Sequence, residues 1–92
     1  MKNLPKIAEL LEPVLVILNE NGPLSHQQIE SKIVARLEIP EDLRHLVRSG
    51  KRTELNYRLS WARTKAKNLG YVVREESGLW RMTEAGKNYL RK

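Results

Sequence analysis

Residues 53–82 read TELNYRLSWARTKAKNLGYVVREESGLWRM, and the spacing of their apolar side chains changes partway along. From Leu55 to Leu69 the apolar residues recur every three or four positions, which predicts one face of a helix. Thr53 is a good residue to start that helix, and Gly70 is a good residue to end it. The sequence therefore predicts one long helix in the middle of the chain.

A hairpin is predicted directly after this helix. Residues 71–74 and 79–82 are short β-prone runs, and the turn 75–78 between them ends in glycine. This spacing is typical of two antiparallel strands joined by a tight turn. We expect Trp80 to pack within the hairpin rather than to bind a ligand, because neighbouring strand residues alternate between its two faces.

A first helix is predicted near the N-terminus, where an apolar stripe with a 3.6-residue period runs from Ile7 to Leu18. Pro13 interrupts this stripe, and proline disfavours helical backbone in the residue before it. We therefore expect a short arm over residues 4–11 and a helix over Glu12–Asn19.

A second helix is predicted after Ser25, because Ser25 and Gln28 have the spacing of a capping box. Pro40 ends this run, and a short helical piece is predicted over Glu41–Val47. Residues 49–52, Ser-Gly-Lys-Arg, are expected to form a loop.

The last predicted helix covers Glu84–Leu90, with Thr83 as its cap and with Ala85, Tyr89 and Leu90 folded back on the core. The fold class is therefore α+β, mainly α. Three helices, a two-stranded wing hairpin and a C-terminal helix form the layout of a winged helix-turn-helix. A chain of 92 residues has room for one core, so residues 1–92 are expected to form a single domain with 1–11 as an N-terminal arm.

Positive charge is concentrated in one part of the chain, whose formal net charge is +6. Residues 1–42 carry a net −3, residues 43–70 carry +7, and residues 71–92 carry +2. Clustered lysine and arginine bind a polyanion such as DNA by releasing its counterions. The alternative is a solvated basic face that has no partner.

Helix 53–69 carries polar and basic side chains opposite its apolar stripe. Amide and guanidinium groups can read base edges in the major groove of double-stranded DNA, whereas lysine, arginine and hydroxyl groups contact phosphates. Candidates for reading or positioning bases are Asn56, Ser60, Arg63 and Thr64; candidates for contacting phosphate are Lys51, Arg52, Tyr57, Arg58 and Lys67; and Arg74 is a candidate for flanking a groove.

Some of these polar and aromatic residues have a purely structural alternative. Asn56 lies near a helix start, where a local hydrogen bond is as good an explanation as a base contact. We expect Trp61 to pack against the preceding helix or loop. His26 and His45 have no metal-ligand spacing and are expected to be surface residues.

Six short pieces of the sequence carry a family resemblance that extends over about residues 12–90. They are Glu-Pro-Val-Leu (12–15), Ser-Gly-Lys (49–51), Asn-Tyr-Arg (56–58), Trp-Ala (61–62), Leu-Gly (69–70) and Gly-Leu-Trp-Arg-Met-Thr-Glu-Ala-Gly (78–86). In this order and spacing they resemble the N-terminal domain of Mrr-type restriction endonucleases, the winged helix that precedes a nuclease domain in enzymes that attack modified DNA.

The resemblance implies a DNA-recognition domain of a restriction system, with methylated DNA among its ligands and a nuclease domain or subunit as a partner. One feature departs from the family, whose wing often has a basic residue beside its glycine. This wing has Glu75 and Glu76 instead, and carboxylates repel phosphate.

Several classes of function are not expected. The chain has no cysteine, which excludes disulfide scaffolds, cysteine-ligated zinc and thiol catalysis. Without a long apolar run or an apolar N-terminal stretch, we expect a cytoplasmic protein that does not enter membranes. A PD-(D/E)xK nuclease needs an aspartate and a Glu-x-Lys on adjacent strands, whereas Glu30-Ser-Lys32 precedes the lone Asp42 and lies in a predicted helix. We therefore expect no enzyme activity, no metal and no cofactor.

Two other functions compete with DNA targeting. The first is a protein-docking module that binds a nuclease or motor subunit through the acidic N-terminal third. The second is a small transcriptional regulator of winged-helix type, which would form a homodimer so that two helices meet adjacent half-sites.

Overall fold

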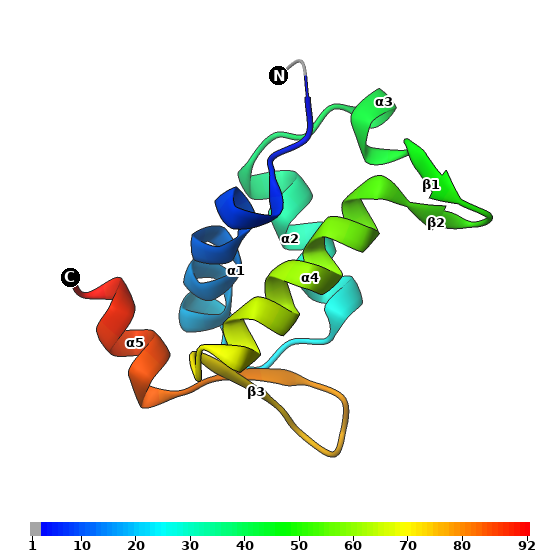
Figure 1. Ribbon diagram of the computed structural model, residues 1–92. Helices are drawn as coiled ribbons and strands as arrows, with labels where there is room; N and C mark the ends of the chain where they lie inside the picture. Colours follow the sequence, from blue (N-terminus) through cyan, green and yellow to red (C-terminus); the bar gives the residue numbers. More distant parts are fainter. Residues whose placement is uncertain (1–2) are drawn as a thin grey trace.

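The computed structural model describes residues 3–92, in which five helices surround a shared core and two short hairpins project from it (Figure 1). The fold is α+β and mainly helical, and each sheet is a two-stranded antiparallel hairpin. The elements are α1 (Ile7–Asn21), α2 (His26–Arg36), α3 (Glu41–Arg44), β1 (Val47–Ser49), β2 (Arg52–Thr53), α4 (Glu54–Asn68), β3 (Val72–Arg74), β4 (Trp80–Met82) and α5 (Glu84–Leu90).

Helix α1 runs through Pro13 without a break, so the predicted division into an arm and a later helix is wrong. Proline removes one N–H donor and crowds the carbonyl four residues earlier, which costs about 3 kcal/mol in a helix interior. The buried side chains on both sides of it outweigh this cost, because they pack only when the helix is continuous: Leu10, Leu11, Val14 and Leu15. The backbone N–H of Lys6, the N-cap residue, donates to the Glu9 carboxylate at 2.8 Å.

Helix α2 begins with the predicted capping box. The Ser25 hydroxyl accepts from the Gln28 N–H at 3.2 Å, and the Gln28 side chain accepts from the Ser25 N–H at 2.9 Å. Ile29 and Ile33 are fully buried on its inner face. The prediction for this helix start is confirmed.

The segment between α2 and α4 contains a hairpin that the sequence analysis missed. The predicted helical piece over residues 41–47 stops at Arg44. Of the expected loop 49–52, only residues 50–51 form a turn, because Ser49 ends β1 and Arg52 begins β2. These strands are very short and Val47 is 67% exposed, so no buried face imposes an alternating pattern.

Helix α4 has Thr53 as its N-cap, and the Thr53 hydroxyl accepts from the Asn56 N–H at 3.0 Å. Most of the predicted stripe is buried: Leu55, Leu59, Ala62 and Ala66. Leu69 differs from the prediction and is 48% exposed, because it is the C-cap residue and the chain turns away from the helix direction there. The stripe fixes which side of α4 remains available to a ligand.

Strands β3 and β4 form the predicted hairpin, with Val72 opposite Met82 and Arg74 opposite Trp80. The chain just before α2 joins this sheet, because Leu24 and Trp80 exchange two backbone hydrogen bonds of 3.1 and 2.7 Å. Trp80 is 8% exposed, which agrees with the expectation that it packs. The hairpin is therefore attached to both α4 and the start of α2.

Helix α5 begins at Thr83, whose hydroxyl accepts from the Gly86 N–H at 3.1 Å, as predicted for a cap. The prediction that Ala85 faces the core is wrong, since Ala85 is exposed and Gly86 is buried in its place. Tyr89 stacks on Tyr71 with 4.7 Å between ring centroids. Helix α5 approaches the backbone of Tyr71 so closely that only glycine fits at position 86.

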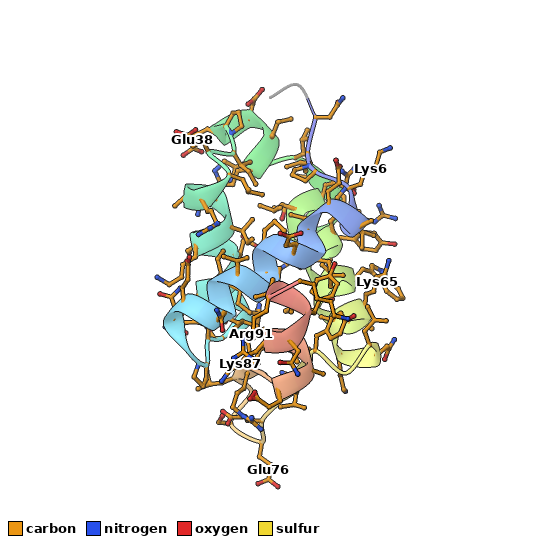
Figure 2. All side chains as sticks on the ribbon, turned by 90° about the vertical axis from the view of Figure 1, so that its left-hand side faces the viewer. Lys6, Glu38, Lys65, Glu76, Lys87 and Arg91 are labelled. Atoms are coloured by element: carbon orange, nitrogen blue, oxygen red, sulfur yellow. The ribbon has the colours of Figure 1, made fainter. Side chains whose placement is uncertain are left out.

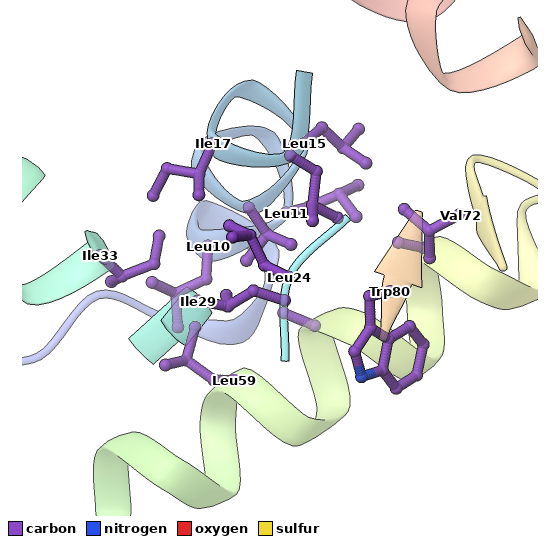
Figure 3. Packing of buried hydrophobic residues seen from close by; sticks show 14 of the residues in the cluster. Leu10, Leu11, Leu15, Ile17, Leu24, Ile29, Ile33, Leu59, Val72 and Trp80 are labelled. Carbon is purple, nitrogen blue, oxygen red and sulfur yellow. The ribbon is translucent and has the colours of Figure 1, made fainter. Parts of the chain in front are cut away.

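The core lies where α1 packs against α2, α4, α5 and β4 (Figure 3). Its largest fully buried side chains come from α1, α2 and α4, and Val72 and Trp80 extend it under the second hairpin. Of the helices formed by residues 3–92, none has the length and apolar character needed to cross a membrane.

Candidate nucleic-acid interface

The structure divides the predicted site residues into two groups along α4. The first group lies at the N-terminal end of α4 beside the β1–β2 hairpin and consists of Lys51, Arg52, Asn56, Tyr57 and Arg58. The second lies on the C-terminal half of α4 beside β3 and consists of Ser60, Arg63, Thr64, Lys67 and Arg74.

In the first group, the side chain of Asn56 is held by one local hydrogen bond and by one bond to α2. Its side-chain oxygen accepts from the Arg52 guanidinium at 3.0 Å, and its amide nitrogen lies 3.5 Å from a carboxylate oxygen of Glu30. These contacts are the structural alternative considered for Asn56. They also hold Arg52, which comes from β2, against the surface of α4.

Tyr57 is half-buried under the β1–β2 hairpin, because two arginines of this hairpin cover its ring. The guanidinium carbon of Arg48 lies 3.5 Å from the ring centroid, and that of Arg52 lies 5.5 Å from it. Cation–π contacts of this kind attach the basic hairpin to the helix. Lys51 is exposed in the turn between the two strands.

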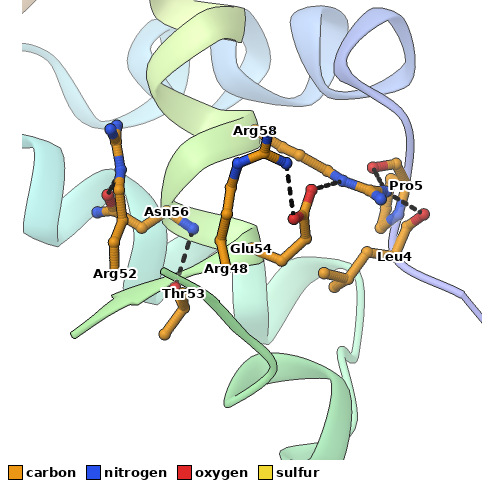
Figure 4. A network of polar contacts seen from close by, with 8 residues as sticks. All are labelled: Leu4, Pro5, Arg48, Arg52, Thr53, Glu54, Asn56 and Arg58. Carbon is orange, nitrogen blue, oxygen red and sulfur yellow. Dashed lines mark hydrogen bonds and ion pairs between the residues drawn. The ribbon is translucent and has the colours of Figure 1, made fainter. Parts of the chain in front are cut away.

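Arg58 is the centre of a polar network that joins α4 to the N-terminal segment (Figure 4). Its Nε atom donates to the Glu54 carboxylate at 2.7 Å, and its Nη1 atom donates to the backbone carbonyls of Leu4 and Pro5 at 3.0 and 3.1 Å. Arg48 donates to the other oxygen of Glu54 at 3.1 Å. Much of the Arg58 guanidinium is therefore already engaged within the domain.

Arg58 and Arg48 also favour the charged form of the Glu54 carboxyl group. The hydrogen bond from Arg58 lowers the pKa of the Glu54 carboxyl below its usual value, burial opposes this shift, and Arg48 adds to it. Glu54 therefore stays ionised and links β1, α4 and the N-terminal segment.

The second group surrounds a cavity of about 310 Å³ between α4, β3, β4 and the start of α2. Hydroxyl, amide, basic and aromatic side chains line it, and none of them is acidic: His26, Ser60, Arg63, Thr64, Lys67, Asn68, Arg74 and Trp80. Lys67 and Arg74 are exposed, whereas Ser60 and Thr64 are half-buried. A cavity with these walls is suited to an anion.

Arg63 lies deeper than its predicted place at the edge of the outer face, since only 8% of its surface is exposed. Its guanidinium carbon lies 5.5 Å from the centre of the Trp80 ring, and its Nε has no hydrogen-bond partner in the part of the chain that the structure describes. Burial lowers the pKa of Arg63, Glu30 opposes this shift, and Arg74 and Arg52 add to it. Arginine nevertheless keeps its charge at neutral pH.

Three residues line the cavity but are not among the predicted site residues: His26, Asn68 and Trp80. Trp80 reaches it because β4 places its ring near both Arg63 and Arg74, whose guanidinium carbons lie 5.5 and 5.8 Å from the ring centroid. A signal was available, since the predicted hairpin places Trp80 almost opposite Arg74. The position of His26 depends on the Leu24–Trp80 pairing, which no local pattern indicates.

The acidic tip of the β3–β4 hairpin is partly neutralised. Glu75 forms an ion pair with Arg81 at 3.3 Å, whereas Glu76 is exposed and points away from the rest of the domain (Figure 2). One of the two carboxylates that depart from the family pattern is thus balanced within the hairpin itself.

A second, apolar hollow of about 360 Å³ lies on the other flank of α4, beside α1. Ile7, Trp61 and Leu69 form its apolar wall. Trp61 was expected to pack against the preceding helix or loop, but it is 51% exposed and lines this hollow. The side chain lies over the open space between the two helices instead of entering the core.

Residues 3–92 contain no cluster of three histidine, aspartate or glutamate side chains that could hold a metal ion.

Comparison with known families identifies the chain. The family model described as the Mrr N-terminal domain matches residues 8–92. The chain belongs to the Mrr N-terminal domain family. The match covers the whole span of 12–90 over which the sequence resembled this family, so that prediction is confirmed. No curated protein and no solved structure matches the chain.

Membership in the Mrr N-terminal domain family relates the chain to restriction systems. The Mrr N-terminal domain is distinct from the catalytic nuclease part of such systems.

Proposed function

We propose that this Mrr N-terminal domain binds double-stranded DNA through a basic face that we call the α4 face. It consists of the outer side of α4 together with the β1–β2 turn and the end of β3. The observation that carries the proposal is that the polar and basic residues Asn56, Ser60, Thr64 and Lys67 of α4 lie between Arg52 of β2 and Arg74 of β3, with the buried Arg63 beneath them.

The continuity of the α4 face is supported by contacts between successive members. Arg52 is hydrogen-bonded to Asn56, and Ser60, Arg63, Thr64, Lys67 and Arg74 line one cavity. Steps of three or four residues keep side chains on the same side of a helix. Helix α4, with this face outward, therefore suits insertion into the major groove of DNA, between the two phosphate backbones.

We further propose that the fold is a winged-helix variant in which β3 and β4 are the wing and α4 is the recognition helix. The pairing of Leu24 with Trp80 supports this topology, because it attaches the wing to the chain before α2. The β1–β2 hairpin is then an insertion between α3 and α4 that adds Arg48, Lys51 and Arg52 to the DNA-facing side.

Individual roles follow from exposure and existing contacts. Lys51, Arg52, Lys67 and Arg74 are exposed, which suits phosphate contacts. Asn56, Ser60 and Thr64 lie between them and suit the bases. We propose that Tyr57 and Arg58 mainly position the hairpin and the N-terminal segment, since their ring and guanidinium are engaged there.

The biological role that we propose is DNA targeting for a restriction system, with methylated DNA as the preferred substrate and a nuclease domain or subunit as the partner. A cytoplasmic location follows from this role, because the substrate is intracellular DNA.

Salt-dependent binding to matched duplexes tests this function. Fluorescence anisotropy would compare unmodified, adenine-methylated and cytosine-methylated DNA over a range of salt concentrations. We expect a steep salt dependence and tighter binding of one methylated duplex. Lys67→Gln is expected to lower the salt slope by about one unit, whereas Lys65→Gln on the other flank of α4 leaves it unchanged. Absence of binding near physiological salt would contradict the proposal.

Protein docking is a second candidate function, favoured by the exposed apolar hollow around Trp61 and Leu69. Contiguous exposed apolar surface is typical of interaction sites. In that case Trp61→Ser would abolish binding to a nuclease subunit, or dissociate a homodimer in a light-scattering concentration series. DNA binding with an unchanged salt slope in the same variant would show that the two surfaces are independent.

A further inference from the structure

Arg63 is a buried cation whose charge is poorly compensated. Only 8% of the residue is exposed, and within residues 3–92 no carboxylate lies within ion-pair distance of it. Glu30 is the acid whose charge favours the charged form of Arg63. Its carboxylate, however, is in contact with the side-chain amide of Asn56, at 3.5 Å. Buried charges are normally paired, because leaving water is costly for an isolated ion. Arg63 therefore lacks an anionic partner.

A second cation crowds the same site. The guanidinium carbons of Arg63 and Arg74 lie 5.5 and 5.8 Å from the centre of the Trp80 ring, and the charge of Arg74 disfavours that of Arg63. The indole ring attracts both through its π face. However, a ring without net charge cannot remove the repulsion between two cations, whereas an anion between them can.

The cavity next to Arg63 has walls suited to such an anion. It encloses about 310 Å³, its rim carries Lys67 and Arg74, and the hydroxyl-bearing Ser60 and Thr64 line its side. The Thr64 hydroxyl already donates its proton to the Ser60 carbonyl at 3.0 Å, so the donors left for an anion include the three bases and the Ser60 hydroxyl. All charged side chains in the lining are bases.

The start of α2 adds a partial positive charge. His26, the first residue of this 11-residue helix, lines the cavity, and the Ser25 hydroxyl is already used to cap the Gln28 N–H. The first N–H groups of a helix lack partners within the helix and favour anions. The N-terminal end of α2 therefore borders the cavity that Arg63, Lys67 and Arg74 line.

We propose that this cavity is a phosphate-binding site in which Arg63 contacts the anion from below and Lys67 and Arg74 contact it from the rim. The phosphate is one backbone phosphodiester of DNA, so the proposal rests on the proposed function for its source. Arg63 then anchors the backbone where α4, the wing and the start of α2 meet, and it does not read a base. This replaces the base-reading role that the sequence suggested for Arg63.

The test uses two ligands and four proteins. NMR amide shifts would follow titration with inorganic phosphate against chloride at equal ionic strength, and anisotropy would follow DNA binding at several salt concentrations. The proteins are wild type, Arg63→Met, Arg74→Gln and the control Lys65→Gln, which removes a charge from the same helix outside the cavity. A thermal melt checks that each variant folds. If Arg63→Met does not fold, the result with Arg74→Gln decides the outcome.

We expect phosphate to shift the amides of Ser60, Thr64 and Lys67 in the wild type, with saturation at millimolar concentrations. Arg63→Met abolishes these shifts, Arg74→Gln weakens them several-fold, and Lys65→Gln leaves them unchanged. In the DNA experiment, Arg63→Met and Arg74→Gln each lower the salt slope by about one unit.

The two proposals fail in different ways. Tight DNA binding with an unchanged slope in Arg63→Met, and no amide shifts with phosphate, would overturn the phosphate site and leave the proposed function standing. Saturable phosphate shifts without any DNA binding would support the site but overturn DNA as its source.

Discussion

At the scale of single residues, the structure shows how strongly a close backbone approach can constrain the sequence. Gly86 is in α5, where the helix passes directly over the backbone of Tyr71. A Cβ atom added to Gly86 would overlap the carbonyl oxygen of Tyr71 and would lie 2.9 Å from the terminal carbon of Met82. Backbone cannot move aside as a flexible side chain can, so the position requires glycine.

The prediction is that Gly86→Ala destabilises the domain by about 1–3 kcal/mol, as overpacking does in other cores. The gain in helix propensity, about 1 kcal/mol for Gly to Ala, is expected to be smaller than the clash. Urea unfolding would measure the change. Lys87→Ala, at the exposed neighbouring position, is the control and is expected to stay within about 0.5 kcal/mol of wild type. Equal or greater stability of Gly86→Ala would contradict the prediction.

Glu54 gives a prediction about pH. Its pKa is lower in the folded domain than in the unfolded chain, chiefly because Arg58 donates to its carboxylate. The stability that this ionisation contributes is therefore present above the unfolded pKa and is lost as pH falls through the folded pKa. Glu54→Gln should remove that part of the acid dependence. Thermal melts from neutral to acidic pH would measure it, and parallel pH profiles for both proteins would contradict the assignment.

At the scale of elements, what could be predicted from sequence depended on whether local signals and packing agree. The start of α2, the stripe of α4 and the β3–β4 hairpin were predicted because caps, periodicity and turn residues give the same answer there. The β1–β2 hairpin was missed, because its exposed strands have no buried face. The course of α1 through Pro13 was also missed, because packing there overrides a local breaker.

Helix α1 is therefore the element whose local sequence conflicts most with its structure. Pro13→Ala restores the missing N–H and removes the crowding at the carbonyl four residues earlier. We expect it to raise the free energy of unfolding, by at most about 3 kcal/mol. Pro23→Ala is a matched control in an exposed loop position, where loss of proline lowers stability by about 0.4–1 kcal/mol. A Pro13→Ala variant less stable than wild type would show that the proline ring itself is needed for packing.

At the scale of the whole molecule, the charge pattern of the sequence located the region of the candidate site but not its internal order. The excess of positive charge in residues 43–70 lies on α4 and on the hairpin before it, which is the region that the clustering of bases in the sequence indicated. Which of these bases are free depends on distant contacts that no local pattern contains. Arg58 is engaged by carbonyls more than 50 positions away in the chain, and Arg63 is buried beside Trp80 from the second hairpin.

If the α4 face binds DNA, the location of a charge matters more than the net charge of the domain. The double variant Lys51→Gln/Arg52→Gln neutralises two bases of the β1–β2 hairpin. Lys87→Gln/Arg91→Gln neutralises one base of α5 and the base that caps its C-terminal end, and α5 packs on α1. Each double variant lowers the formal net charge of +6 by the same two units. We expect the first to lower the salt slope of DNA binding by about two units and the second to leave it nearly unchanged, since each phosphate contact contributes about 0.9. Equal slopes for the two variants would mean that DNA responds to the overall charge of the domain, and the α4 face would then have no special role.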